Sequence, residues 1–83
     1  MNDKLARLDY YTLLGVDAGA STADIKRAFR GFARRYHPDN HTDDPARHRR
    51  ATAIFRRGTE AYRVLLDREL RTIYDAELAK GEK

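Results

Sequence analysis

The sequence contains no cysteine, and this absence excludes several kinds of site at once. Without thiols the chain cannot form a disulfide framework, a cysteine nucleophile or a zinc site with cysteine ligands. Ser21 is its single serine, and the start of a helix explains that residue. The five glycines are scattered, so there is no glycine-rich phosphate loop. These absences leave little from which to build an active site, and we expect no catalytic residue and no cofactor.

Long apolar runs are also missing. No segment approaches the roughly 20 apolar residues that a membrane-spanning helix needs. Residues 1–8 lack the apolar core of a signal peptide, so a cytoplasmic location is expected. The 83 residues are enough for one domain with a modest core. We expect a folded domain over residues 9–78, between a flexible lead-in at 1–8 and a tail at 79–83.

Positive charge is in excess. The chain has 17 Lys and Arg against 13 Asp and Glu, a formal net charge of +4. This balance favours an acidic partner, which could be a nucleic acid, an anionic membrane surface or an acidic protein surface. The membrane surface is the weakest of the three, because the apolar residues are needed for the core.

Apolar residues follow a helical period in two long segments, residues 21–36 and 45–66, and no strand pattern is present. The first begins at a capping-box-like Ser21 and Asp24, and the second begins at Asp44-Pro45. Because each segment has one apolar stripe, we expect the two helices to pack antiparallel in an all-α fold. The stripes are Ile25, Ala28, Phe29, Phe32, Ala33 and Tyr36, and Ala51, Ile54, Phe55, Gly58, Ala61, Tyr62 and Leu65.

Two shorter helices complete the expected fold. Asp9 caps the first, over residues 10–14, in which Tyr11 and Leu14 share a face, and Gly15 ends it. Asp67 caps the last, which runs to about residue 78. The apolar strip of this last helix is Leu70, Ile73 and Tyr74.

Gly58 is unusual in the second stripe, because glycine in a helix interior costs about 1 kcal/mol relative to alanine. It either permits a close approach of the two helices or leaves a thin place in the core.

The tripeptide His37-Pro38-Asp39 ends the first long helix, because proline disfavours helical backbone in the residue before it. A loop over residues 37–44 then joins the two long helices. The exposed side of the first helix is basic, which fits either a solvated face or an electrostatic docking face. Its basic residues are Lys26, Arg27, Arg30, Arg34 and Arg35.

The loop contains further polar residues, and these suggest two other candidate functions, metal binding and nucleic-acid binding. His37, Asp39, His41, Asp43 and Asp44 could in principle bind a metal, but Pro38 breaks the helix that would align the two histidines, so no metal is expected. A small basic helical module that binds nucleic acid is the alternative function. The three carboxylates at the tip would repel phosphates, and the loop is long for a helix-turn-helix.

The order of these residues resembles the J-domain of the DnaJ co-chaperone family, over residues 9 to 77. A bare His-Pro-Asp is a weak signal, and its flanks make the resemblance strong. The matching residues are Asp9-Tyr10-Tyr11, Leu14-Gly15-Val16, Ile25-Lys26-Arg27-Ala28-Phe29, Ala33, Tyr36-His37-Pro38-Asp39, Phe55, Glu60-Ala61-Tyr62, Val64-Leu65, Asp67, Arg71 and Tyr74-Asp75.

The resemblance implies a four-helix domain, monomeric in isolation, that is not an enzyme. Such a domain binds a DnaK-type seventy-kilodalton heat-shock chaperone and stimulates its ATP hydrolysis in support of protein folding, and the ATP and Mg²⁺ belong to the partner. By position, the binding residues are His37, Pro38 and Asp39 with Lys26, Arg27, Arg30, Arg34 and Arg35. Asp39 could accept hydrogen bonds from a partner arginine or hold the loop through its own backbone, and both roles stay open.

Three positions depart from the family pattern. Gly31 stands where a basic residue is usual, Asn40-His41 replaces a common Arg-Asn, and Gly58 replaces a bulky apolar residue. The first two changes remove positive charge from the docking side, and the third puts the packing of the core in doubt.

Overall fold

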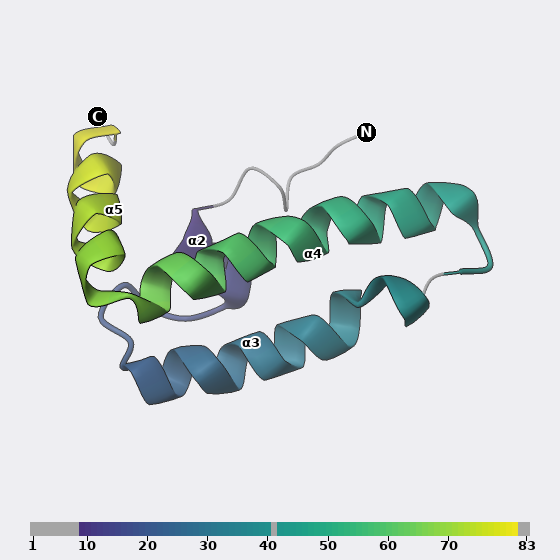
Figure 1. The fold of residues 1–83 in the computed structure, drawn as a ribbon, viewed down its shortest axis with the longest axis horizontal. Helices are drawn as coiled ribbons and strands as arrows, with labels where there is room; N and C mark the ends of the chain where they lie inside the picture. The colour runs from purple at the N-terminus through teal and green to yellow at the C-terminus, as the bar shows by residue number, and fades with distance from the viewer. Residues whose placement is uncertain (1–8, 41, 82–83) are drawn as a thin grey trace.

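The computed structural model describes residues 9–40 and 42–81, and these residues form an all-α fold. Figure 1 shows the two long helices, α3 (Thr22–Tyr36) and α4 (Pro45–Leu66), side by side and antiparallel, with α2 (Tyr10–Leu14) against α4 and α5 (Arg68–Gly81) across the end of the pair. The predicted fold class and antiparallel pair are confirmed. The elements are α2 (Tyr10–Leu14), α3 (Thr22–Tyr36), the 3₁₀ turn η1 (Pro38–Asn40), α4 (Pro45–Leu66) and α5 (Arg68–Gly81).

Short-range caps set the bounds of α2. The side chain of Asp9 accepts a hydrogen bond from the backbone N–H of Thr12 at 2.9 Å. Gly15 ends the helix with φ of 80°, a left-handed backbone that glycine adopts without strain. Four of the five residues in α2 are buried, namely Tyr10, Tyr11, Leu13 and Leu14. The sequence predicted a shared apolar face only for Tyr11 and Leu14, so α2 enters the core more deeply than expected.

The long helices also begin at the expected caps. The hydroxyl of Ser21 accepts from the N–H of Asp24 at 3.1 Å, and the carboxylate of Asp44 accepts from the N–H of Ala46 at 2.9 Å. Helix α3 ends at Tyr36, because the next residue has extended backbone ahead of Pro38. None of the described helices is both long enough and apolar enough to cross a bilayer.

Gly58 allows α3 and α4 to pack closely. Gly58 and Phe32 are both buried, and a Cβ atom added at Gly58 would overlap the ring of Phe32. Of the two explanations for this glycine, close approach of the helices is therefore correct. The ring of Phe32 fills the space that a larger residue at Gly58 would occupy.

We expect Gly58→Ala to lower the free energy of unfolding by roughly 1 kcal/mol, as measured by urea denaturation. Overpacking a core costs about 1–3 kcal/mol, which exceeds the roughly 1 kcal/mol that alanine gains over glycine in a helix. Adding Phe32→Leu should relieve the overlap, so the double variant should be more stable than the sum of the single changes by at least about 0.5 kcal/mol. A Gly58→Ala variant as stable as the native chain would contradict this account.

Helix α5 begins as predicted and continues further. The carboxylate of Asp67 accepts from the N–H of Leu70 at 3.0 Å, which confirms the expected cap. The helix extends through Gly81, so residues 79–81, expected as part of the tail, are helical. Residues 82 and 83 lie outside the described part of the chain, as does the expected lead-in at residues 1–8.

The inward face of α5 differs from the prediction. The ring of Tyr74 stacks on that of Tyr10, with centroids 4.4 Å apart, and its hydroxyl accepts from the N–H of Tyr10 at 2.9 Å. Leu70 and Ile73 are 41% and 58% exposed, so only Tyr74 of the predicted apolar strip packs against the core. Leu78 packs against the core in their place. The bonds made by Tyr74 fix which side of the helix faces inward.

Polar contacts join α5 to the other end of the sequence. Arg71 donates from Nε to the hydroxyl of Tyr11 at 2.9 Å, and from Nη2 to the carbonyls of Ala18 and Ala20, both at 2.9 Å. The hydroxyl of Tyr11 in turn donates to Asp75 at 2.6 Å. These contacts attach α5 to α2 and to the loop before α3.

Tyr10 makes the stability of the fold depend on pH in the alkaline range. Burial, and then its hydrogen bond to Glu60, raise the pKa of Tyr10 to about 12 from 10.0. Because the unfolded chain releases this proton first, stability should be complete below pH 10.0 and fall as the pH rises toward about 12. We expect Tyr10→Phe to show a smaller loss of stability across this interval, measured by urea denaturation at fixed pH values. An unchanged pH dependence in Tyr10→Phe would contradict the assignment.

Candidate partner-binding site

The tripeptide after α3 forms a tight turn closed by its own histidine. The N–H of Asp39 donates to Nδ1 of His37 at 3.2 Å, and the N–H of Asn40 donates to the carbonyl of His37 at 2.9 Å. A ring nitrogen that accepts a hydrogen bond carries no proton, so this geometry has the His37 proton on Nε2. One carboxylate oxygen of Asp39 lies 3.7 Å from Nδ1, which would become an ion pair if that nitrogen were protonated.

Two further contacts anchor this turn to the long helices. The side-chain amide of Asn40 donates to the carbonyl of Arg34 at 2.8 Å. This carbonyl belongs to the last turn of α3, where backbone acceptors have no partner within the helix. The ring of His37 lies against Phe55 of α4, with centroids 5.3 Å apart. The turn is thus attached to both helices of the pair.

The sequence did not indicate these anchoring roles. Asn40 stood out only as a lost positive charge, although asparagine just after a helix is a common turn residue. Phe55 was assigned to the apolar stripe, and nothing in its spacing distinguished it from its neighbours. The structure shows that Phe55 contacts the turn as well as the core.

The carboxylate of Asp39 points to solvent. Its side chain is 88% exposed and that of His37 is 47% exposed, while Pro38 is half-buried. Among the described residues, the side chain of Asp39 accepts no hydrogen bond. Bonding within the loop, one of the two roles expected for Asp39, is therefore performed by His37 and Asn40. The Asp39 carboxylate is left accessible to a donor from another molecule.

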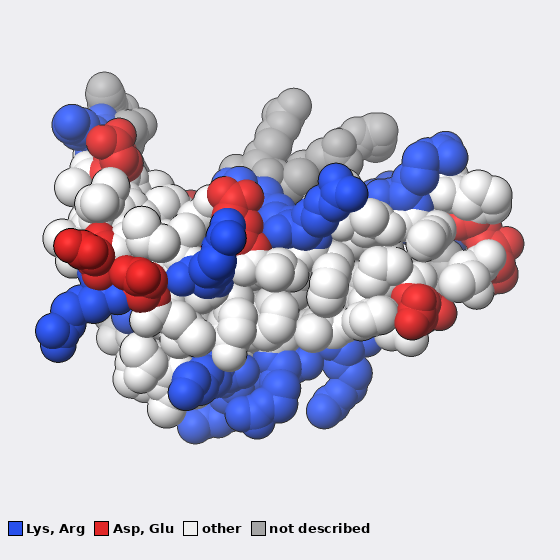
Figure 2. Space-filling view, in the orientation of Figure 1, with Lys and Arg blue, Asp and Glu red and all other residues white. Residues whose placement is uncertain are grey.

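The basic residues of α3 lie on its exposed side. Lys26, Arg27, Arg30, Arg34 and Arg35 are all exposed. In Figure 2, Lys and Arg side chains line the lower edge of the molecule along α3, which leads to the turn. The structure therefore brings the predicted cationic residues and the tripeptide together in one continuous region.

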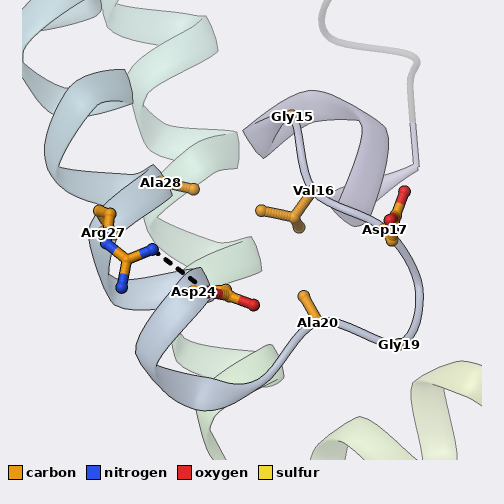
Figure 3. A pocket seen from close by; sticks show the side chains of 8 residues that line it. All are labelled: Gly15, Val16, Asp17, Gly19, Ala20, Asp24, Arg27 and Ala28. Carbon is orange, nitrogen blue, oxygen red and sulfur yellow. Dashed lines mark hydrogen bonds and ion pairs between the residues drawn. The ribbon is translucent and has the colours of Figure 1, made fainter.

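Arg27 differs from the other basic residues of this face. Its guanidinium forms an ion pair with Asp24 one turn earlier, at 3.2 Å, as Figure 3 shows. The two side chains border a hollow between α3 and the loop before it. An exposed pair of this kind contributes little to stability, so Arg27 can exchange its partner at small cost.

The hollow in Figure 3 has no chemistry typical of an active site. Val16, Ala20 and Ala28 form its apolar part. Its charged residues are Asp17 and the paired Asp24 and Arg27, and its lining contains no histidine, serine or threonine. Within residues 9–40 and 42–81, no group of three or more His, Asp and Glu side chains is placed to hold a metal ion. His41, one of the possible ligands considered, is outside these residues.

Comparison with known proteins decides the family. A family model described as the DnaJ domain matches residues 9–75. The chain belongs to the DnaJ domain family. This finding confirms the resemblance carried by the tripeptide and its flanks, and the match covers the three helices α2, α3 and α4 and most of α5.

Several relatives of this DnaJ domain are named Chaperone protein DnaJ. The chain is 52% identical over 67 residues to the one from Thermoplasma volcanium, which covers 81% of this chain and 18% of the relative. It is 46% identical over 70 residues to the one from Treponema denticola, which covers 84% of this chain and 17% of the relative. It is 49% identical over 71 residues to the one from Methanothermobacter thermautotrophicus, which covers 86% of this chain and 18% of the relative. The chain thus spans less than a fifth of these relatives. No solved structure matches it.

We expect Asn40→Ala to loosen the turn of this DnaJ domain. Loss of the hydrogen bond to the carbonyl of Arg34 should lower the free energy of unfolding by about 0.5–1.5 kcal/mol. Exchange of the backbone amides of Asp39 and Asn40 should become faster, measured by NMR; Pro38 between them and His37 has no amide proton. Asn40→Asp, which lacks the N–H donor, should behave in the same way. Exchange rates in Asn40→Asp equal to those of the native chain would show that this hydrogen bond does not hold the turn.

Proposed function

We propose that this DnaJ domain is a co-chaperone module that binds a DnaK-type seventy-kilodalton heat-shock chaperone and stimulates its ATP hydrolysis. The observation that carries the proposal is the exposed carboxylate of Asp39, held on an anchored turn beside a cationic helix face. Membership of the DnaJ domain family and relatives named Chaperone protein DnaJ support it. In this proposal the chaperone holds the ATP and Mg²⁺, and this chain contributes contacts rather than catalysis.

The cationic face acts first, as a long-range guide. Lys26, Arg30 and Arg34 are exposed and lie in one row, four residues apart on α3. Like charges placed this way repel by about 0.2–0.5 kcal/mol per pair in isolated helices, and an acidic partner surface relieves that repulsion. Such attraction speeds encounter and orients the partner, and it weakens with salt because the Debye length is about 10 Å at 0.1 M.

The turn then makes the specific contact. A carboxylate can accept two parallel hydrogen bonds from an arginine, an arrangement that fixes geometry as well as energy. Asp39 can offer both oxygens because Nδ1 of His37 and the amide of Asn40 hold the turn. Pro38 contributes its fixed φ, which limits the shapes the turn can adopt. His37 and Pro38 therefore position Asp39, and Asp39 binds the partner.

The test is single-turnover ATP hydrolysis by a DnaK-type chaperone at low salt, with and without the domain. The native sequence should accelerate hydrolysis. Asp39→Asn should reduce the acceleration at least tenfold at subsaturating concentration, because removing one partner of a buried charge pair costs about 2–5 kcal/mol. Asp43→Asn is the matched control, since it removes the same charge from an exposed position of the same loop. It should retain most of the acceleration.

Two results would contradict the proposal. One is the absence of any acceleration by the native domain across the DnaK-type chaperones tested. The other is equal acceleration by the native domain and Asp39→Asn, which would remove the carboxylate from the mechanism.

A further inference from the structure

A second cationic row runs along α4, separate from the face of α3. Arg49, Arg56 and Arg63 are seven residues apart, so they lie close to one line on the helix. They lie on the side of α4 away from its buried residues, and all three are exposed. Across the whole of α4 the sequence has six arginines and one glutamate. We call Arg49, Arg56 and Arg63 the outer row.

The outer row is not neutralised by the nearest acidic residue. None of its three arginines forms a hydrogen bond or ion pair with another described residue. Glu60 lies four residues after Arg56 and three before Arg63, within reach of either. Its carboxylate instead accepts a hydrogen bond from the buried hydroxyl of Tyr10 in α2. Glu60 remains beside the row, but three arginines against this one carboxylate leave the row with a net positive charge.

The outer row faces away from the proposed chaperone-binding face. Figure 2 shows Lys and Arg along two opposite edges of the molecule, one following α3 and the other following α4. A partner bound along α3 and the turn would leave the α4 edge accessible. The outer row is therefore available to a different partner.

The surface between these arginines indicates the kind of partner. Its residues are small or polar: Thr52, Ala53, Thr59 and Glu60. A membrane-binding helix needs large apolar side chains to insert, and single-stranded nucleic acid is usually held by exposed aromatic rings. The one aromatic residue beside the described part of the row is Phe55, which is partly buried and lines a hollow with Arg56 and Arg63. Its ring already packs against Phe29 and His37, so it is not free to stack on a base or to insert into a membrane. The remaining feature of this surface is its straight series of cations.

The spacing of the outer row fits a duplex backbone. At 1.5 Å per residue, successive arginines are about 10.5 Å apart along the helix and the row is about 21 Å long. The major groove of B-form DNA is about 12 Å wide, so neighbouring arginines can reach phosphates on its two sides. The carboxylates of the turn lie beyond the first residue of α4 and outside this row.

We propose that the outer row of α4 binds the phosphate backbone of double-stranded DNA without sequence preference, as an activity additional to chaperone binding. Three phosphate contacts release about three counterions, and the logarithm of the binding constant should then fall with the logarithm of salt concentration with a slope near −3. Binding is therefore weak and strongly dependent on salt.

The experiment is a titration of a labelled mixed-sequence DNA duplex with the domain, followed by fluorescence anisotropy at several salt concentrations. The native domain should bind at low salt with the slope given above. Arg49→Ala/Arg63→Ala should bind at least about tenfold more weakly at low salt, with a slope near −1, because two phosphate contacts are lost. Circular dichroism checks that this variant, and the control variant described below, remain as helical as the native domain.

The matched control is Arg30→Ala/Arg34→Ala, which removes the same charge from α3. It should retain the slope of the native domain and bind DNA nearly as well. In the ATPase assay the two variants should exchange roles, with the α3 variant impaired and the α4 variant active. Equal loss of DNA binding in both variants would overturn the proposal, since it would show an effect of net charge alone. So would the absence of DNA binding by the native domain at low salt, whatever the outcome of the ATPase assay.

Discussion

Aromatic packing between α3 and α4 is the constraint from which the rest of the structure follows. The ring of Phe29 stacks on Tyr62, with centroids 4.2 Å apart, and lies 6.5 Å from Phe55. Phe55 in turn contacts His37 at 5.3 Å. Pairs of this kind contribute about 0.5–1.5 kcal/mol beyond the burial of their area. This series of ring contacts connects the core to the turn. The orientation of Asp39 therefore depends on residues far from it in the sequence.

The same packing determines where the charges lie. Once the apolar stripes of α3 and α4 face each other, the exposed residues Arg30 and Arg34 of α3 and the outer row of α4 lie on opposite edges of the pair. Each edge carries a net positive charge, and like charges one turn apart on α3 weaken that helix by about 0.2–0.5 kcal/mol per pair. Buried residues such as Ile25, Ala61 and Leu65, each at most 1% exposed, must offset this repulsion. The domain thus retains two cationic surfaces at a cost to its stability, which is understandable if each has an acidic partner.

Features set by neighbouring residues could be predicted from the sequence, and features set across long separations could not. The bounds of α3 and α4 follow from Ser21, Pro38 and Asp44, whose effects reach three or four residues. The orientation of α5 depends on bonds from Tyr74 and Arg71 to residues more than 50 positions earlier. Periodicity alone therefore grouped the exposed Leu70 and Ile73 with the packed Tyr74 in one apolar strip. At the site, residue types identified the tripeptide and the basic face, while its anchors became visible only in three dimensions.

The two glycines that depart from the family pattern have opposite physical meanings. Gly58 faces a ring that already occupies the space of a side chain, so Phe32 requires it. Gly31 has no atom within 4 Å of an added Cβ and is exposed, so packing does not require it. It costs about 1 kcal/mol of helix stability relative to alanine and omits a charge from α3. Asn40 also omits a charge, but its amide holds the turn. The proposed site therefore combines a weaker electrostatic guide with a firmly anchored turn, and its affinity should depend more on the geometry of Asp39 than on the number of positive charges beside it.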